Sequence, residues 1–459
     1  MQGINRLLGV AFLAVATALP QGGMAETLAD ALIAAYRNSN LLDQNRAVLR
    51  AADEDVAQAV ASLRPVINLQ AGVVHNNTRG NIPSDGLSAS LSLTAQLTLL
   101  DFGRNRASIK AAEASVLASR QSLIGVEQDV LLSAVAAYVN LRQMQDAVGL
   151  RAANVRLIGQ ELRAAQDRFE VGEITRTDVS IAEARLASAR AAMAEAQGDL
   201  TVARENYQLA IGHPPGSLSP LPRLPATARS LEEARAIALR THPSIRQLQH
   251  MVSVSEANVE RAKAEMGPSL TANAAINDRS GGRGIDNQSV GITLNQTIYS
   301  GGRISSLYRQ ALAGRASTRA QLHQAGAIVT QGVGEAWSNL AVARASIAAS
   351  DEQIRSAQTA YEGVREEARL GARTTLDVLN AEQELLSART ARLSAESVRY
   401  TGTYALLAEM GLLTVEHLNL GIPVHDPEAY YNAVRNAPAT SSQGRRLDRV
   451  LEAIGKTKP

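Results

Sequence analysis

The sequence contains no cysteine among its 459 residues, and only 3% of the residues are aromatic. Without cysteine there can be no disulfide, no thiolate metal site, no iron–sulfur cluster and no cysteine nucleophile. An excess of one charge is also missing, because 46 lysines and arginines are balanced by 44 aspartates and glutamates, which leaves +2. This balance argues against a nucleic-acid partner, which normally needs a basic excess or cluster. Few aromatic rings and many alanines favour closely packed helices over a thick mixed core.

The N-terminus has the pattern of a secretory signal peptide covering residues 1–25. Arg6 precedes an apolar run over 7–19, Pro20 ends this run, and Gly23 and Ala25 supply small residues before a cleavage site. An uncleaved membrane anchor is the alternative, but the 13-residue run is shorter than the ~20 residues that span a bilayer. No later stretch of the sequence approaches a membrane-spanning helix in its apolar length.

The sequence repeats itself. Three glycines recur 199 residues later, so that Gly103, Gly172 and Gly212 correspond to Gly302, Gly371 and Gly411. This spacing predicts a tandem duplication, with a first repeat over 26–212 and a second over 231–411. A proline-rich connector over 213–230 separates them, and a segment over 412–436 follows. The tail over 437–459 is poor in apolar residues and is predicted to be disordered.

Each repeat contains a predicted pair of β-strands, about 66–76 and 87–99 in the first and about 270–278 and 289–298 in the second. From Leu87 to Leu99 apolar and polar residues alternate without exception. The polar faces of the strands are expected to carry Ser, Thr, Asn and Gln, with no charge within the strands. Strands of this length suit a tilted bilayer crossing, although a soluble, half-buried sheet is the alternative. Four strands cannot close a membrane barrel, which needs at least about eight. Two chains would supply eight strands, and three would supply twelve.

Long helices are predicted after each strand pair, over 103–169 and 177–210 and again over 302–369 and 375–410. A helix of 67 residues is about 100 Å long, which exceeds any globular core. Apolar residues from Leu123 to Phe169 recur about every 3.5 residues, the period of a left-handed coiled coil. The fold class is therefore mainly α with a small β part, and the long helices predict a rod or a cylinder.

This arrangement, with Asp101-Phe102-Gly103-Arg104 and Ser300-Gly301-Gly302-Arg303 after the strands, resembles the TolC-type outer-membrane efflux protein family over nearly all of 26–420. The resemblance implies a homotrimer with a shared 12-strand transmembrane β-barrel in outer-membrane lipid. It also implies an α-helical tunnel through the periplasm, with 213–230 and 412–436 in an equatorial belt. No cysteine is present for lipid attachment, so the non-lipidated branch is indicated.

The function that this resemblance implies is the exit duct of a tripartite efflux pump or a type I secretion system. Its implied partners are a periplasmic adaptor protein and an inner-membrane transporter of the ABC or RND type. The alternative is a periplasmic coiled-coil scaffold or adaptor without a pore, and the alternating strands favour the channel. No arrangement of catalytic residues, no metal-ligand spacing and no cofactor motif is recognisable, so neither an enzyme nor a cofactor is predicted.

Two groups of site residues follow from the resemblance. The first is a periplasmic gate, in which three copies of Asp377 would form a ring: Thr177, Asp178, Arg373, Asp377 and Asn380. Asn380 stands where the family often has a second acid, which halves the charge of the ring. The alternative for the two aspartates is simple stabilisation of helix N-termini.

The second group is a docking surface for the adaptor at the two glycine turns: Val171, Gly172 and Glu173, with Leu370, Gly371 and Ala372. The alternative for Gly172 and Gly371 is an ordinary role in ending a helix, which is compatible with docking.

Overall fold

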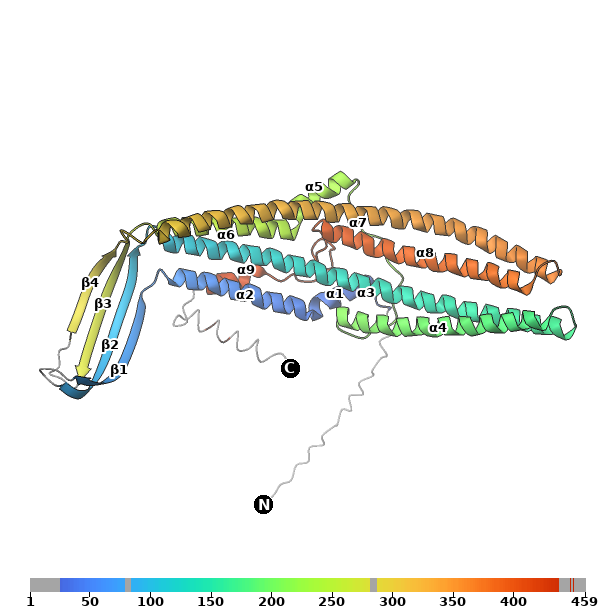
Figure 1. Ribbon diagram of the computed structural model, residues 1–459, viewed down its shortest axis with the longest axis horizontal. Helices are drawn as coiled ribbons and strands as arrows, with labels where there is room; N and C mark the ends of the chain where they lie inside the picture. Colours follow the sequence, from blue (N-terminus) through green and yellow to red (C-terminus); the bar gives the residue numbers. More distant parts are fainter. Residues whose placement is uncertain (1–24, 79–83, 281–286, 437–445, 447–448, 450–459) are drawn as a thin grey trace, which may run out of the picture.

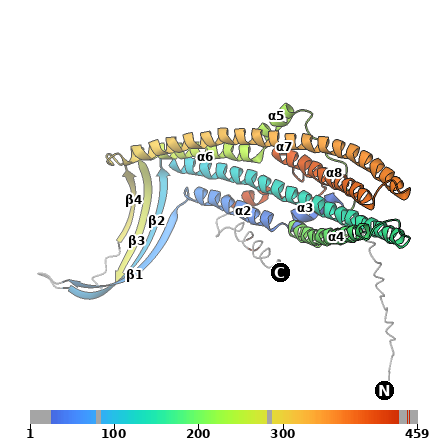
Figure 2. The same ribbon diagram turned by 45° about the vertical axis from the view of Figure 1, so that its right-hand side comes forward.

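The computed structural model describes residues 25–78, 84–280, 287–436, 446 and 449. The predicted signal peptide and tail therefore lie almost entirely outside the described residues. The chain is elongated, with a β-sheet at one end and two helical hairpins that end in turns at the other (Figure 1). The same opposition of sheet and turns is visible in the rotated view (Figure 2).

Both halves of the chain have the same order of elements, which confirms the tandem duplication. The first half contains α1 (Leu28–Asn38), α2 (Asn40–Ala61), β1 (Val66–Thr78), β2 (Ser84–Leu100), α3 (Arg104–Glu170) and α4 (Arg176–Ile211). The second half contains α5 (Leu231–Thr241), α6 (Pro243–Ala264), β3 (Ser269–Ser280), β4 (Asn287–Asn295), α7 (Arg303–Arg369) and α8 (Thr375–Glu409), and α9 (Pro427–Val434) follows.

The sheet is antiparallel with the order β1-β2-β3-β4. Its last strand ends at Asn295 rather than at the predicted residue 298, because the chain turns toward α7 there and Gln296 donates a hydrogen bond to the Met266 carbonyl at 3.1 Å. Strand β3 continues through Asp278 and Arg279. The expectation of strands without charge is therefore wrong at this end of the sheet.

Local hydrogen bonds explain where α4 and α8 begin and end. Thr175 and Thr374 cap α4 and α8 through their side-chain oxygens. At the other end, Asn38 Nδ2 donates to the Ile211 carbonyl at 3.1 Å. Thr241 Oγ1 likewise donates to the Met410 carbonyl at 2.6 Å. The last carbonyls of α4 and α8 thus find partners on the short helices that open each half.

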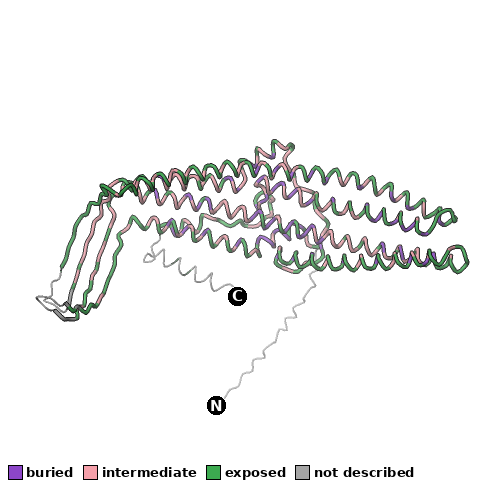
Figure 3. Tube along the Cα trace, in the orientation of Figure 1, coloured by how far each residue is buried: buried purple, intermediate pink, exposed green. Residues whose placement is uncertain are grey.

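The densest core lies at the middle of the helical body, where Figure 3 shows many of the buried positions. Tyr138 and Tyr207 are fully buried there, with ring centroids 6.4 Å apart, among side chains such as Leu131 and Leu141. Within the described residues one helix, α3, is long and apolar enough to cross a membrane. The most apolar window of α3 is 56% buried by the rest of the chain, as in the core helix of a folded body.

Candidate channel sheet and periplasmic gate

The sheet has one apolar face that no element of the described chain covers (Figure 1). Leu93 lies opposite Leu69 on β1 and opposite Ile276 on β3, so the apolar side chains of neighbouring strands share this face. Val73 remains 67% exposed and Ile292 68%. An apolar surface of this extent on a folded chain marks a contact with lipid or protein.

The opposite face of the sheet is polar and forms hydrogen bonds between strands. Ser92 Oγ donates to Asn277 Oδ1 at 2.6 Å, and Asn273 Nδ2 donates to Thr293 Oγ1 at 3.1 Å. The alternation predicted from the sequence is therefore a real separation of two faces, one suited to lipid and one suited to water.

The predicted docking residues lie on the two turns at the far end of the helices. Gly172 and Gly371 both have φ of 80°, a conformation that favours glycine. Val171 is 72% exposed and Leu370 is 79% exposed. Each turn thus presents one apolar side chain beside a glycine whose backbone is open to a partner.

Beside each turn an ion pair joins two residues of the same hairpin. Arg168 Nε lies 3.2 Å from Glu173 Oε2, and Arg373 Nε lies 2.8 Å from Glu367 Oε2. In this chain Arg373 therefore binds an acid of its own hairpin rather than Asp178 of the other one.

The two predicted gate aspartates both complete capping boxes, in which each carboxylate also accepts from the capping threonine. Asp178 Oδ2 accepts from Thr175 N at 3.0 Å, and Asp377 Oδ2 accepts from Thr374 N at 3.0 Å. Hydrogen bonds from the Thr374 backbone and hydroxyl, with a smaller contribution from Arg373, hold the pKa of Asp377 below its usual range. The role at the helix start is therefore present in the single chain.

The remaining gate residues differ in their surroundings. Thr177 is exposed on the first turn of α4. Asn380 Oδ1 accepts a hydrogen bond from Arg185 Nη2 of α4 at 3.2 Å, so it joins the two hairpins. The sequence offered no sign of this contact, because Arg185 is an ordinary charged residue on a predicted helix.

Sequence reasoning also missed a buried pair between the hairpins. Asn154 of α3 donates a hydrogen bond to Glu382 of α8, and each residue is only 5% exposed. The available signal was the spacing of Glu382, which lies four residues after Val378 and three before Leu385, at a position expected to be apolar.

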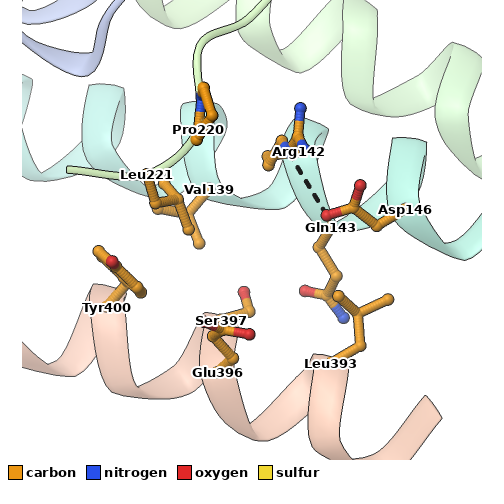
Figure 4. Close-up of a pocket in the computed structure, with 10 residues that line it drawn as sticks. All are labelled: Val139, Arg142, Gln143, Asp146, Pro220, Leu221, Leu393, Glu396, Ser397 and Tyr400. Atoms are coloured by element: carbon orange, nitrogen blue, oxygen red, sulfur yellow. Dashed lines mark ion pairs between the residues drawn. The ribbon is translucent and has the colours of Figure 1, made fainter. Parts of the chain in front are cut away.

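A cavity of about 240 Å³ lies at the middle of the body, between α3, the connector and α8 (Figure 4). Arg142 and Asp146 on its wall form an ion pair at 3.4 Å, and Tyr400 donates to the Pro222 carbonyl at 2.8 Å. Its charges are thus largely satisfied within the chain, and it lies where the connector meets the helices. Among the described residues no group of three His, Asp or Glu side chains could hold a metal ion.

The comparisons with known proteins agree with this architecture. The model of the outer membrane efflux protein family matches residues 32–213 and again residues 235–412. The chain belongs to the outer membrane efflux protein family. This membership gives it an outer-membrane location, with the helices extending into the periplasm, and a role in efflux or secretion. The two separate matches correspond to the two halves of the duplication.

Individual relatives cover most of the chain. The outer membrane efflux protein BepC of Brucella suis is 36% identical over 440 residues, which cover 94% of this chain and 96% of BepC. The alkaline protease secretion protein AprF of Pseudomonas aeruginosa is 29% identical over 73% of this chain and 72% of its own length. Among solved structures, the CmeC outer membrane channel of Campylobacter jejuni has a TM-score of 0.75 at 16% identity, covering 89% of each chain.

Proposed function

We propose that three copies of this chain assemble into one continuous duct, with a shared 12-strand barrel in the outer membrane and a helical tunnel below it. The observation that carries this proposal is the four-stranded sheet, whose apolar face is uncovered and whose two outer strands have no neighbour in the described chain. In lipid every backbone N–H and C=O needs a partner, so an open sheet cannot be inserted alone.

Pairing of β4 of one copy with β1 of the next removes both free edges. Three copies give twelve strands. Two copies would give eight, a barrel so narrow that side chains fill its interior. The polar inner face, lined by residues such as Ser92 and Asn277, then faces a water-filled lumen. A trimer therefore fits a duct better than a dimer does.

The turns around Gly172 and Gly371 supply the docking surface for a periplasmic adaptor protein. Their apolar side chains, Val171 and Leu370, are among the most exposed apolar residues of the helical part, and such exposure favours a protein contact. Through the adaptor the duct would serve an inner-membrane transporter of the ABC or RND type. Glu173 and Ala372 distinguish the two turns chemically and would tune the choice of adaptor.

The gate lies just above these turns. Threefold symmetry would bring three copies of Asp377 to one axis. Thr177, Asp178 and Asn380 lie near the starts of α4 and α8, and Arg373 lies in the turn that precedes α8. The capping bonds of Asp377 fix its side chain, which favours a defined ring over a mobile charge. The duct itself would be passive and not an enzyme, and its cargo would be chosen by the transporter.

The test is assembly and conduction by the full-length protein. Purified from outer membranes in mild detergent, it should sediment as a trimer and form ion-conducting channels in planar bilayers. A monomer in the soluble periplasmic fraction would instead support the scaffold without a pore. A detergent-stable dimer would contradict the twelve-strand barrel.

A further inference from the structure

The two hairpins, α3 with α4 and α7 with α8, meet along a contact that we call the hairpin seam, between the middle of the body and the turns (Figure 1). Three polar contacts cross it: Arg365 with Glu161 at 3.4 Å, Arg185 with Asn380 at 3.2 Å, and Asn154 with Glu382. Apolar side chains such as Leu157, Ile158 and Leu379 fill the space between them.

These polar contacts differ in burial, and burial decides how much each one matters. The Arg365 side chain is 56% exposed, and in the second contact Asn380 is exposed while Arg185 is half-buried. Exposed pairs of this kind contribute little to stability. Asn154 and Glu382 are each 5% exposed, so removal of either partner leaves a buried polar group without a hydrogen bond.

Both residues of the buried pair occupy positions where a coiled coil normally has apolar side chains. Glu382 is flanked at helical spacing by Leu379 and Leu385, which are 2% and 5% exposed. Asn154 lies one turn before Ile158 on α3. Apolar contacts alone allow helices to slide or change partner, whereas a single polar core position fixes register and partner.

We propose that the Asn154–Glu382 pair positions the second hairpin against the first and thereby holds the gate end of the duct narrow. The inference rests on the proposed function, because the gate is part of it. Glu382 lies five residues of α8 beyond Asp377 and two residues beyond Asn380. Any movement that separates α8 from α3 at the pair must therefore carry both gate residues with it.

Separation of the two hairpins near the turns also changes the surroundings of Asn154 and Glu382. It breaks the hydrogen bond from Asn154 and moves the Glu382 carboxyl from the seam into water. Closure returns the carboxyl to the same partner, since no other hydrogen bond of Glu382 crosses to the first hairpin among the described contacts. The pair thus favours one closed register rather than a range of them.

The charges around Glu382 come from every helix packed near it. Burial raises the pKa of Glu382, while the hydrogen bond from Asn154 and the positive charges of Arg389 on α8 and Arg151 on α3 lower it. The buried Tyr361 of α7 is close enough to interact with Glu382, and the half-buried Arg185 of α4 binds Asn380, two residues before Glu382. Ionised or neutral, Glu382 keeps an oxygen that can accept from Asn154, so the native pair should tolerate a change of pH.

This tolerance provides a sharp test, because Asn154→Asp should destroy it. While the seam is closed, two buried carboxyl groups in contact cannot both ionise, so they must share a proton. The variant should therefore be closed at about pH 5. At about pH 8, where loss of both protons is favoured, it should open, because the two carboxylates separate into water. A merely structural loss of packing would show no such pH dependence.

Closure of the seam can be measured with cysteines, since the chain has none of its own. A variant with Arg185→Cys and Asn380→Cys places one thiol on each hairpin and keeps Asn154 and Glu382. A short bifunctional thiol reagent should link its two hairpins at both pH values. With Asn154→Asp the ratio of linked to unlinked chains should fall about tenfold at the higher pH, the size expected for one unpaired buried group, and recover in acid. The reactivity of the reagent itself changes with pH, so the same measurement is made on two matched controls, Gln160→Glu and Glu384→Gln. These are exposed changes on the same two helices.

A second experiment exchanges the carboxylate and the amide between the two positions. Asn154→Asp combined with Glu382→Gln again places one carboxylate against one amide, and it should restore linking at the higher pH. Unchanged linking in Asn154→Asp, or no recovery in the reversed pair, would overturn the positioning role. Glu382→Gln alone should remain linked, because its amide oxygen still accepts from Asn154.

Conductance separates this inference from the proposed function. In proteins without the added cysteines, Asn154→Asp should conduct more than the native trimer at the higher pH and equally in acid. Reduced linking with native conductance would overturn the claim that the pair holds the gate narrow. If no trimer conducted, native protein included, the proposed duct itself would be wrong, and linking alone would still decide whether the pair positions the hairpins.

Discussion

The sheet and the helical body contain similar apolar side chains but bury them in different ways. In the body Tyr138 and Leu131 are 0% exposed, enclosed by helices of the same chain. In the sheet Leu69 is 69% exposed and Leu87 65%, although the backbone is fully ordered into strands. The body therefore completes its core within one chain, whereas in the proposed duct the sheet depends on lipid and on other copies for its apolar contacts.

The largest effect is expected where this dependence on lipid is attacked. Leu91→Arg with Leu93→Arg places charges on the apolar face and should prevent assembly in the outer membrane, since each arginine near the midplane costs about 2–4 kcal/mol. Ser92→Arg, between them on the polar face, should assemble. Outer-membrane fractionation and the yield of trimer measure both. Equal behaviour of the two faces would contradict a lipid-facing sheet.

The body should instead be sensitive to its own close contacts. Gly411 has φ of 70°, and a Cβ there would lie 2.7 Å from the His242 Cα, a backbone atom. Gly411→Ala should destabilise the trimer by about 2–4 kcal/mol, from the left-handed conformation and the overlap together.

Gly172→Ala is the matched control, because Gly172 has φ of 80° but open space around its Cβ position. It should cost only about 1–2 kcal/mol, the penalty of the backbone conformation. Thermal unfolding followed by circular dichroism compares the two, and similar losses would mean that the contact with His242 relaxes freely.

Much of the fold could be predicted because it depends on local patterns. The alternation from Leu87 to Leu99 specified a strand with two faces, and the recurring glycines specified the duplication. The helix starts were also readable, since Thr175 and Asp178 have the spacing of a capping box. This same spacing explains why a gate aspartate and a capping aspartate look alike in a sequence.

The site was less predictable because its contacts join distant segments. The sequence identifies Asn154 and Glu382 only as polar residues on long helices, and nothing local states that α3 packs on α8. Asn380 was assigned from the family resemblance as a weaker substitute for an acid. Its bond to Arg185 depends on how the two hairpins pack, and the spacing along one helix cannot reveal it.

The turns at the far end of the hairpins form a surface that, in the proposed function, needs a protein partner instead of lipid. Gly172→Val with Gly371→Val places β-branched residues at positive φ, where they are strained, and covers the backbone of both turns. Export should be lost while the trimer still reaches the outer membrane. Export assays and trimer yield measure the two outcomes separately. Loss of the trimer itself would show that the glycines serve only to end their helices.

The smallest effect is expected from the charge of Asp377. If three copies line the narrow end, they should favour cations, as acidic rings do in other pores. Asp377→Asn should reduce this preference without changing trimer yield, and the effect should weaken at high salt. Because Asn380 replaces a second acid, the native preference should be moderate.

The pH at which the preference fades depends on two opposing influences on this carboxylate. The capping bonds from Thr374 lower the pKa of Asp377, so its charge persists above that lowered value and is lost only as pH falls through it. Repulsion between three carboxylates acts in the opposite direction and spreads the titration over several steps. We expect cation preference to hold at neutral pH and to fade only as the pH falls into the acid range, where the carboxylates become protonated. Reversal potentials of single trimers under a KCl gradient measure this, with Asp178→Asn as the control, because Asp178 completes the same capping box in the first half but is not the predicted ring. If Asp178→Asn shifts the reversal potential as much as Asp377→Asn does, the preference comes from the general charge of the tip, and Asp377 is only a residue that stabilises the start of α8.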